Sequence, residues 1–249
     1  MEKTERKEKR YGLIGKDISY SFSRGYFSEK FTKSNLLDHS YENFDLANIS
    51  EFKDIVNQNH LSGLNVTIPY KELIIPFLDE LDTTAERIGA VNTIRFKNDK
   101  LMGYNTDAYG FKESLSVHLK GHHKNALILG TGGASKAIAH VFDELDIPFQ
   151  FVSRNPKKQQ LRYQELNKKI IEDHQIIVNC SPVGTYPNIH QKPEIPYKYL
   201  TKNHLLFDLI YNPSKTVFLK EGDAKGAIIQ NGLPMLEFQA EKSWEIWNS

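Results

Sequence analysis

The chain has 249 residues, which allows one large or two modest domains with a sizeable core. Its formal net charge of +1 gives no overall attraction to nucleic acid or to a membrane surface, so neither is expected as a partner. The single cysteine, Cys180, excludes an internal disulfide and fits a reducing compartment, so we expect a cytoplasmic location. No run of about 18 apolar residues occurs, and the uniformly charged residues 1–10 predict a disordered lead-in rather than a signal peptide.

The N-terminal part of the chain alternates between strand-like and helix-like segments. Strands are expected at residues 11–15, 41–46, 61–68, 90–96 and 100–104, and helices at 24–36, at 49–56, from 69 and from 106 toward 120. A turn at Asn98-Asp99 joins the last two strands, and Thr106 or Asp107 is expected to cap the helix that follows. This alternation predicts an α/β architecture with a largely parallel sheet.

The C-terminal part repeats the strand–helix alternation. Strands are expected at 126–129, 149–153, 175–180, 205–210 and 227–230, and helices at 134–142, within 156–175, at 216–222 and from about 232. We expect no metal site, because the nine histidines show no H-E-x-x-H motif or Cys/His cluster.

A glycine-rich turn follows the strand expected at 126–129. Gly130, Thr131, Gly132, Gly133 and Ala134 lead into helix-like periodicity, and the motif matches two glycines of G-x-G-x-x-G, with Ser135 at the third place. Glycine lets backbone N–H groups approach a pyrophosphate, and the helix turns its positive end toward the phosphates. The pattern predicts a dinucleotide-binding turn, although a simple tight turn would look similar.

The end of the next strand indicates which dinucleotide binds. The strand ends at Ser153-Arg154-Asn155, where NAD sites usually carry a carboxylate for the ribose 2′-hydroxyl. Arg154, with Lys157 and Lys158 behind it, suits a 2′-phosphate and predicts NADP(H). The alternative is an ordinary solvated basic turn.

Eight motifs resemble the shikimate dehydrogenase family in order and spacing, over residues 11 to about 245. They are Ile18-Ser-Tyr-Ser-Phe-Ser23, Asn65-Val-Thr-Ile-Pro-Tyr-Lys71, Gly89-Ala-Val-Asn-Thr93, Tyr104-Asn-Thr-Asp107, Gly130-Thr-Gly-Gly-Ala-Ser135, Asn179-Cys-Ser-Pro-Val-Gly184, Asp208-Leu-Ile-Tyr211 and Gly232-Leu-Pro-Met-Leu-Glu-Phe-Gln239. Arg24 follows the serine motif where the family usually has proline, and Tyr104 stands where a small or acidic residue is more common.

The resemblance implies an NADP-dependent oxidoreductase that reversibly reduces 3-dehydroshikimate to shikimate in chorismate and aromatic amino-acid biosynthesis. It implies a substrate domain, 11–106 plus 232–249, and a Rossmann-type NADP-binding domain, 107–231, with a cleft between them. The protein would act as a monomer or homodimer.

The resemblance also carries residue roles to matching positions. Lys71 and Asp107 match the catalytic pair, and the substrate-binding positions are Ser21, Ser23, Thr67, Asn92, Tyr211 and Gln239. The cofactor-binding positions are Gly130, Thr131, Gly132, Gly133, Ala134, Ser153, Arg154, Ser181 and Gly232.

The residue types suit this chemistry independently of the family. Neutral hydroxyl and amide side chains can bind a carboxylate that bears several hydroxyl groups. An ammonium group can give a proton to a developing alkoxide and stabilise its charge. Taken alone, Lys71 is an ordinary lysine at a helix start, and Asp107 reads equally well as an N-cap.

Two other classes of function stay open. One is a related enzyme of the same architecture, a quinate/shikimate dehydrogenase or a folate-linked methylene dehydrogenase. Arg154 argues against an NAD-preferring quinate enzyme, and the paired serines with Asn105-Thr-Asp107 argue against a folate enzyme. The other is a catalytically silent NADP-binding module, which would not need both Lys71 and Asp107.

Overall fold

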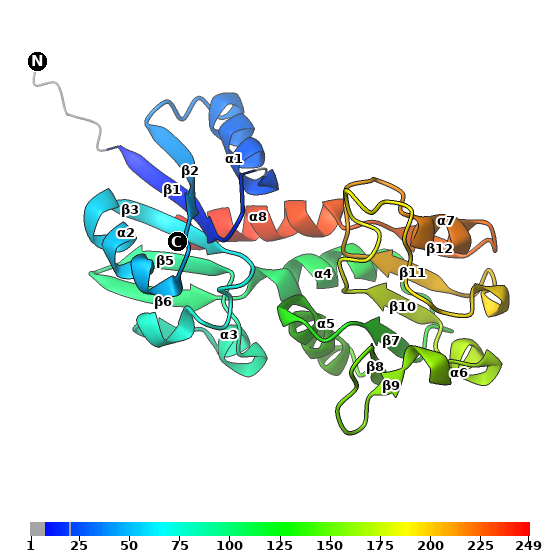
Figure 1. Cartoon of the computed structure of the whole chain (residues 1–249). Helices are drawn as coiled ribbons and strands as arrows, with labels where there is room; N and C mark the ends of the chain where they lie inside the picture. Colours follow the sequence, from blue (N-terminus) through cyan, green and yellow to red (C-terminus); the bar gives the residue numbers. More distant parts are fainter. Residues whose placement is uncertain (1–7, 20) are drawn as a thin grey trace, which may run out of the picture. The chain divides into compact units, whose positions relative to one another are not determined.

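The computed structural model describes residues 8–19 and 21–249, and they form two compact units (Figure 1). Unit 1 comprises Met1–Thr106 with Ala240–Ser249, and unit 2 comprises Asp107–Gln239. The chain passes between them inside two helices, α4 (Thr106–Ser116) and α8 (Leu233–Trp247). Residues 1–7, which belong to the expected disordered lead-in, lie outside the residues that the structure describes. Lys9 and Arg10 of that lead-in belong instead to strand β1, because they pair with His39 and Ser40 of the neighbouring strand.

Unit 1 is built on a mixed sheet of six strands in the order β2-β1-β3-β5-β6-β4. The strands are β1 (Lys9–Gly15), β2 (His39–Asp45), β3 (Leu61–Val66), β4 (Glu80–Leu81), β5 (Thr93–Lys97) and β6 (Lys100–Tyr104). β1 runs parallel to both β2 and β3, whereas β5 is antiparallel to β3 and to β6. The expected turn at Asn98-Asp99 forms this hairpin, with φ of +52° and +60° at its two residues.

The first two helices of unit 1 form close to the expected ranges but shifted by two or three residues, and a third helix was not predicted. They are α1 (Phe22–Lys33), α2 (Phe52–Asn59), preceded by the 3₁₀ turn η1 (Ile49–Glu51), and α3 (Thr83–Ile88). The helix expected from Pro69 is wrong. Residues 68–74 form hydrogen-bonded turns, and then the 3₁₀ turn η2 (Ile75–Phe77) follows, in which Pro76 has no N–H to continue a helical ladder.

Unit 2 is built on a sheet of six parallel strands in the order β12-β11-β10-β7-β8-β9. The strands are β7 (Ala126–Leu129), β8 (Phe149–Ser153), β9 (Leu161–Arg162), β10 (Ile176–Asn179), β11 (Leu205–Asp208) and β12 (Ile228–Gln230). Read from β9, this is the strand order of the dinucleotide-binding fold, and its direction reverses between β7 and β10. The predicted Rossmann-type sheet is therefore confirmed.

Short helices and an apolar core complete unit 2. The helices are α5 (Gly133–Glu144), α6 (Lys168–Asp173) and α7 (Val217–Asp223), with 3₁₀ turns η3 (Tyr163–Glu165) and η4 (Tyr197–Tyr199). One core cluster joins Leu127, Leu129 and Val152 to residues of α6 and α7. Throughout the described ranges, no helix is both long and apolar enough to cross a membrane.

The start of α8 lies with unit 2, whereas the sequence placed all of 232–249 with the substrate domain. The physical reason is close packing of α8 on α4. A side-chain carbon built at Gly110 would lie 2.5 Å from the Met235 carbonyl oxygen and 3.1 Å from the Gln239 amide nitrogen. The chain therefore leaves unit 2 only after Gln239.

Candidate functional site

In unit 1, the carboxyl ends of the parallel strands β1 and β3 bring two candidate segments together. The Thr67 amide donates to the Ile14 carbonyl at 2.8 Å, just beyond the paired residues Ile14 and Val66. A side-chain carbon at Gly15 would lie 2.5 Å from Thr67 Cγ2 and 2.6 Å from Ile18 Cγ2. The serine-bearing loop after β1 therefore starts directly beside Thr67, and only glycine fits at position 15.

Ser21 has an unpaired buried hydroxyl at the start of α1. It is the N-cap residue, with extended backbone (φ −62°, ψ 131°), yet its side chain makes no capping bond. Its Oγ atom is buried and has no hydrogen-bond partner among residues 8–19 and 21–249, and the first turn of α1 carries no acidic residue. Buried hydroxyls are nearly always bonded, so an unpaired one at the start of a helix is suited to an anionic ligand. Tyr20, within the same motif, lies outside the described residues.

Ser23 connects this loop to a buried polar network. Burial raises the pKa of the Tyr41 phenol, and a hydrogen bond from Ser23 opposes that rise. The Tyr41 hydroxyl donates to Asn65 Oδ1 at 2.8 Å, and Asn65 Nδ2 donates to Ser243 Oγ of α8 at 3.0 Å. Tyr41, Asn65 and Ser243 thus form a polar network in unit 1, and Ser23 influences it at Tyr41.

Lys71 and Asn92 are brought together by the backbone. The Val91 amide donates to the Lys71 carbonyl at 2.7 Å, and Val91 directly precedes Asn92. Asn92 is only 3% exposed, and its Oδ1 accepts from the Thr106 amide at 2.7 Å. Lys71 therefore lies in a turn that is hydrogen-bonded to the segment before β5, and not at the start of a helix as the sequence predicted.

The first turn of α4 differs from the expected cap. The helix begins at Thr106, so Thr106 and Asp107 both lie inside it and neither is the cap residue. Asn92 from another segment takes that role, since its side chain bonds the Thr106 amide. Asp107 is the next residue along, with only 3% of its surface exposed, and it is the first residue of unit 2.

In unit 2, the glycine turn lies at the point where the strand order reverses. Gly130 has a φ of +110°, and a side-chain carbon there would lie 3.4 Å from the Ser181 amide nitrogen after β10. The turn and the Ser181 loop therefore meet between β7 and β10, where open α/β sheets bind ligands. Gly132 is the N-cap of α5 and provides no side-chain cap bond, so the positive end of this helix is suited to an anion. Ser135 fits at the third motif position because its hydroxyl donates back to the Gly132 carbonyl at 2.6 Å.

The end of β8 presents the predicted cation. Ser153 is buried and its Oγ accepts from the Asn155 amide at 3.2 Å, which turns the chain after Arg154. Arg154 is exposed, and within residues 8–19 and 21–249 no carboxylate pairs with it, with Lys157 or with Lys158. Burial raises the pKa of the Tyr163 phenol, and the positive charge of Arg154 opposes that rise. Tyr163 follows β9, a short strand that sequence reasoning missed because two residues carry no periodicity.

The end of β11 brings Tyr211 and Gly232 together. The Gly232 amide donates to the Ile210 carbonyl at 3.1 Å, and a side-chain carbon at Gly232 would lie 2.1 Å from the Leu209 carbonyl oxygen. This contact alone requires glycine there. Gln239 lies further along α8 in the same unit.

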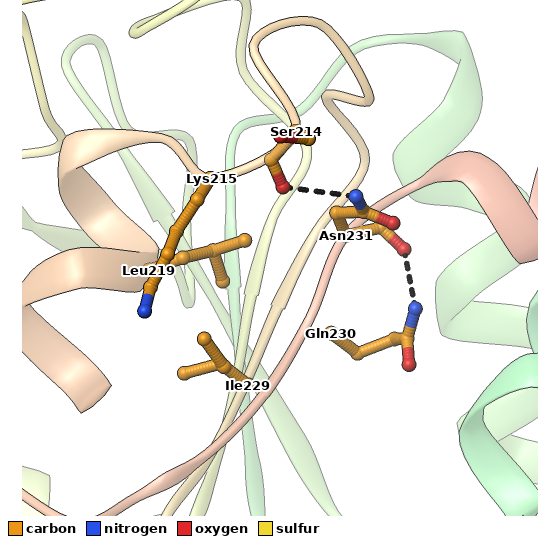
Figure 2. A pocket seen from close by; sticks show the side chains of 6 residues that line it. All are labelled: Ser214, Lys215, Leu219, Ile229, Gln230 and Asn231. Atoms are coloured by element: carbon orange, nitrogen blue, oxygen red, sulfur yellow. Dashed lines mark hydrogen bonds between the residues drawn. The ribbon is translucent and has the colours of Figure 1, made fainter.

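A cavity of about 250 Å³ lies beside this segment (Figure 2). The Asn231 side chain donates to the Ser214 carbonyl at 2.9 Å, and the Gln230 amide donates to the Asn231 carbonyl at 2.9 Å. The cavity is lined by Ser214, Lys215, Leu219, Ile229, Gln230 and Asn231, which the sequence did not single out.

The candidate residues thus separate into two groups. Unit 1 holds Ser21, Ser23, Thr67, Lys71 and Asn92, and unit 2 holds Asp107, Tyr211, Gln239 and all the cofactor candidates. Among the described residues, no group of three or more His, Cys, Asp or Glu side chains is placed to hold a metal ion.

The chain is similar to known proteins over most of its length. Residues 13–94 match the family model of the shikimate dehydrogenase substrate binding domain. The chain is 38% identical to shikimate dehydrogenase (NADP(+)) of Clostridium botulinum strain Hall, covering 95% of each protein. It is also 38% identical to the enzyme of the same name from Methanococcus maripaludis, covering 97% of this chain and 92% of that one.

A solved structure shares the whole fold. The crystal structure of shikimate 5-dehydrogenase from Thermus thermophilus, in complex with NADP(H) and shikimate, superposes with a TM-score of 0.84 at 30% identity. The alignment covers 96% of this chain and 93% of that one. Because the similarity extends over nearly the full length of several relatives, and because the substrate-domain model matches unit 1, this chain belongs to the shikimate dehydrogenase family.

Proposed function

We propose that this chain catalyses the NADPH-dependent, reversible reduction of 3-dehydroshikimate to shikimate, in chorismate and aromatic amino-acid biosynthesis. The observation that carries the proposal is the buried Ser21 hydroxyl at the start of α1, which has no partner in the described part of the chain, in a family whose members are named for a substrate that carries a carboxylate. The single cysteine is consistent with a cytoplasmic enzyme. The protein would act as a monomer or homodimer.

Unit 1 is proposed to bind the substrate. Ser21 and Ser23, with the first amides of α1, would hold its carboxylate, assisted by Tyr211. Thr67, Asn92 and Gln239 would bond the ring hydroxyls. Support comes from the adjacency of the loop after β1 and Thr67 across Gly15.

Unit 2 is proposed to bind NADP(H). The backbone of Gly130, Thr131, Gly132, Gly133 and Ala134 would receive the pyrophosphate at the start of α5. Ser153 and Arg154 would hold the ribose 2′-phosphate, and Ser181 and Gly232 would line the remaining part of the site. The strand order supports this, since the glycine turn lies where the order reverses.

Lys71 and Asp107 are proposed as the catalytic pair. NADPH, when bound, supplies the hydride that reduces the ketone. The Lys71 ammonium would give its proton to the oxygen that becomes a hydroxyl, and in the reverse direction the neutral amine would take it back. Asp107 would hold that ammonium in place and contact the substrate. The backbone bond from Val91 to Lys71 supports this, since it fixes Lys71 beside Asn92 and the start of α4.

A spectrophotometric assay tests the proposal. Purified protein is mixed with shikimate and NADP, and nicotinamide absorbance is followed, with quinate and with NAD as paired controls. We expect turnover with shikimate and NADP that exceeds turnover with quinate or NAD. Faster turnover of quinate with NAD would assign the protein to the quinate type, and no turnover of any pair would identify a binding module.

A further inference from the structure

A buried carboxylate that the proposed reaction does not use lies at the carboxyl end of β11 in unit 2. Asp208, the last residue of β11, has 0% of its surface exposed. Its Oδ1 accepts from Asn179 Nδ2 at 3.0 Å and from the Ile210 amide at 3.1 Å, and its Oδ2 accepts from Thr216 Oγ1 at 2.6 Å. One side chain therefore bonds the end of β10, the loop after β11 and the start of α7.

The bond to Asn179 fixes which way that amide points. Because Asp208 offers only acceptors to Asn179, the Asn179 nitrogen must face Asp208 and its oxygen must face away. That oxygen accepts from both the Ser181 amide at 3.1 Å and the Ser181 hydroxyl at 2.6 Å. Asp208 thereby sets the position of Ser181 through Asn179.

The other two bonds act on the segment that carries Tyr211. The Ile210 amide is held directly, one residue before Tyr211. Thr216 is the N-cap of α7 and accepts from the Leu219 amide at 3.3 Å while donating to Asp208, so the far end of the loop is fixed as well. The loop after β10 also packs against Thr216, because a side-chain carbon built at Gly184 would lie 3.8 Å from Thr216 Cβ.

We propose that Asp208 is a positioning residue of this enzyme, which holds Ser181 for the cofactor and Tyr211 for the substrate through Asn179, Ile210 and Thr216. The inference rests on the proposed function, since it takes Ser181 and Tyr211 as ligand contacts. The residue acts by hydrogen-bond geometry rather than by its charge. Burial raises the pKa of Asp208 to about 6, with the bonds from Thr216, Ile210 and Asn179 opposing that rise.

The geometry distinguishes two substitutions at this site. Asp208→Ala leaves Asn179, Ile210 and Thr216 without their acceptor. Asp208→Asn keeps a side-chain oxygen that accepts from Asn179 and Ile210. Its new NH2 group can donate to the Thr216 hydroxyl, because a hydroxyl can accept as well as donate. We expect Asp208→Ala to raise the Kd for NADPH and the KM for shikimate about 10-fold each, the scale of one bond to a charged group. The asparagine variant should stay within about 3-fold of wild type, and kcat should change little in both.

NADPH affinity is measured by fluorescence titration and shikimate KM by steady-state kinetics, with the melting temperature recorded for each variant. If the alanine variant does not fold, Thr216→Val replaces it, because valine has the shape of threonine but cannot donate a hydrogen bond to Asp208. We expect this variant to raise both the Kd for NADPH and the KM for shikimate. Ser114→Ala is the matched control, because it removes another buried hydroxyl bond of unit 2, to the Gly110 carbonyl at 2.7 Å, away from these loops. It should lower the melting temperature and leave Kd and KM unchanged.

A purely structural role would lower the melting temperature of the Asp208 variants but leave Kd and KM of the folded enzyme unchanged, and this result would overturn the inference. Equal losses in the alanine and asparagine variants would also overturn it, because charge rather than bonding geometry would then be responsible. Failure of the proposed function is distinguishable from both outcomes. Wild-type protein would then show no turnover of shikimate, while the NADPH titrations would still report on Asp208.

Discussion

The side-chain oxygen of Asn92 accepts a hydrogen bond from the backbone amide of Thr106 at 2.7 Å, so a residue beside Lys71 caps the helix that opens unit 2. Asn92 Nδ2 also donates to Thr106 Oγ1 at 3.0 Å, and both residues are buried. The first residue of α4 is therefore held by a side chain of another segment, directly before Asp107.

Asn92→Ala should destabilise the protein as well as weaken substrate binding. The change leaves the Thr106 amide without its acceptor, and an unsatisfied buried group costs about 1–3 kcal/mol. Thermal unfolding followed by circular dichroism should show a loss of this size, together with a raised KM for shikimate. Asn203→Ala, at an exposed position, is the control and should change neither. An Asn92 variant with unchanged stability would show that the bond to Thr106 contributes little.

Ser21→Ala should separate binding from stability. The Ser21 hydroxyl is buried and finds no partner among the residues that the structure describes, so its removal should leave the ligand-free protein as stable as before, or stabilise it by up to about 1 kcal/mol. The same change should raise the KM for shikimate about 10-fold, with NADPH affinity constant. Ser23→Ala should raise that KM similarly, because Ser23 is the second proposed carboxylate ligand. Ser19→Ala, in the same loop but exposed, serves as control. An unchanged KM in the Ser21 variant would remove Ser21 from the carboxylate site.

Arg154→Ala should weaken NADP use and spare NAD use. Loss of one charge-assisted phosphate contact costs about 1.5–3 kcal/mol, so the KM for NADP should rise about 10- to 150-fold. NAD has no 2′-phosphate, so its KM should stay nearly constant. Lys202→Ala, an exposed lysine elsewhere in unit 2, is the matched control. Equal losses with both cofactors would show that Arg154 does not read the 2′-phosphate.

Lys71→Ala should reduce the rate of the chemical step. Without a proton donor at the developing alkoxide, kcat should fall at least about 100-fold, while the KM for shikimate should change less than about 5-fold. NADPH binding should be normal. Asp107→Ala should lower kcat and weaken shikimate binding together. Lys53→Ala, whose native side chain lies over the Phe77 ring, controls for loss of a unit 1 lysine. Retention of wild-type kcat in the Lys71 variant would mean that the proton comes from another group.

His123 should contribute to acid sensitivity. It is 5% exposed, its Nδ1 accepts from the Lys120 amide at 3.1 Å, and burial lowers its pKa to about 4. The folded state therefore binds a proton less readily than the unfolded state. Its stabilising contribution is full above about pH 6.5, decreases as the pH falls, and is lost near pH 4.

The comparison of His123→Asn with wild type isolates this effect. Asparagine keeps an acceptor for the Lys120 amide but does not titrate, so the variant should lose about 1–2 kcal/mol less stability than wild type between pH 7 and pH 5. Urea unfolding at the two pH values measures it, and exposed His122→Asn is the control. The pKa of Asp208 is raised, so its contribution to the free energy of unfolding has the opposite pH dependence. Both proteins contain Asp208, so this contribution cancels in the comparison. Identical pH dependence in variant and wild type would contradict the assignment to His123.

The sequence by itself determined the elements with strong local signals. β6, β7 and β8 begin and end where predicted, because apolar strand runs bounded by turn residues are readable from neighbours alone. The Asn98-Asp99 turn and the glycine turn before α5 were predicted for the same reason, since both depend on backbone conformations that few residue types adopt. Motif order was enough to place the chain in its family.

Tertiary structure alone decided the features that depend on contacts between distant segments. The sheet order of unit 2, the bond from Asn92 to Thr106 and the three bonds to Asp208 join residues far apart in sequence, which periodicity cannot relate. Turns replace the helix expected from Pro69, and the Lys71 carbonyl in these turns accepts a hydrogen bond from the Val91 amide. The part of α8 up to Gln239 belongs to unit 2 because it packs closely on Gly110. In each case a long-range contact outweighs a weak local preference, because burial and hydrogen bonding contribute more free energy than propensity does.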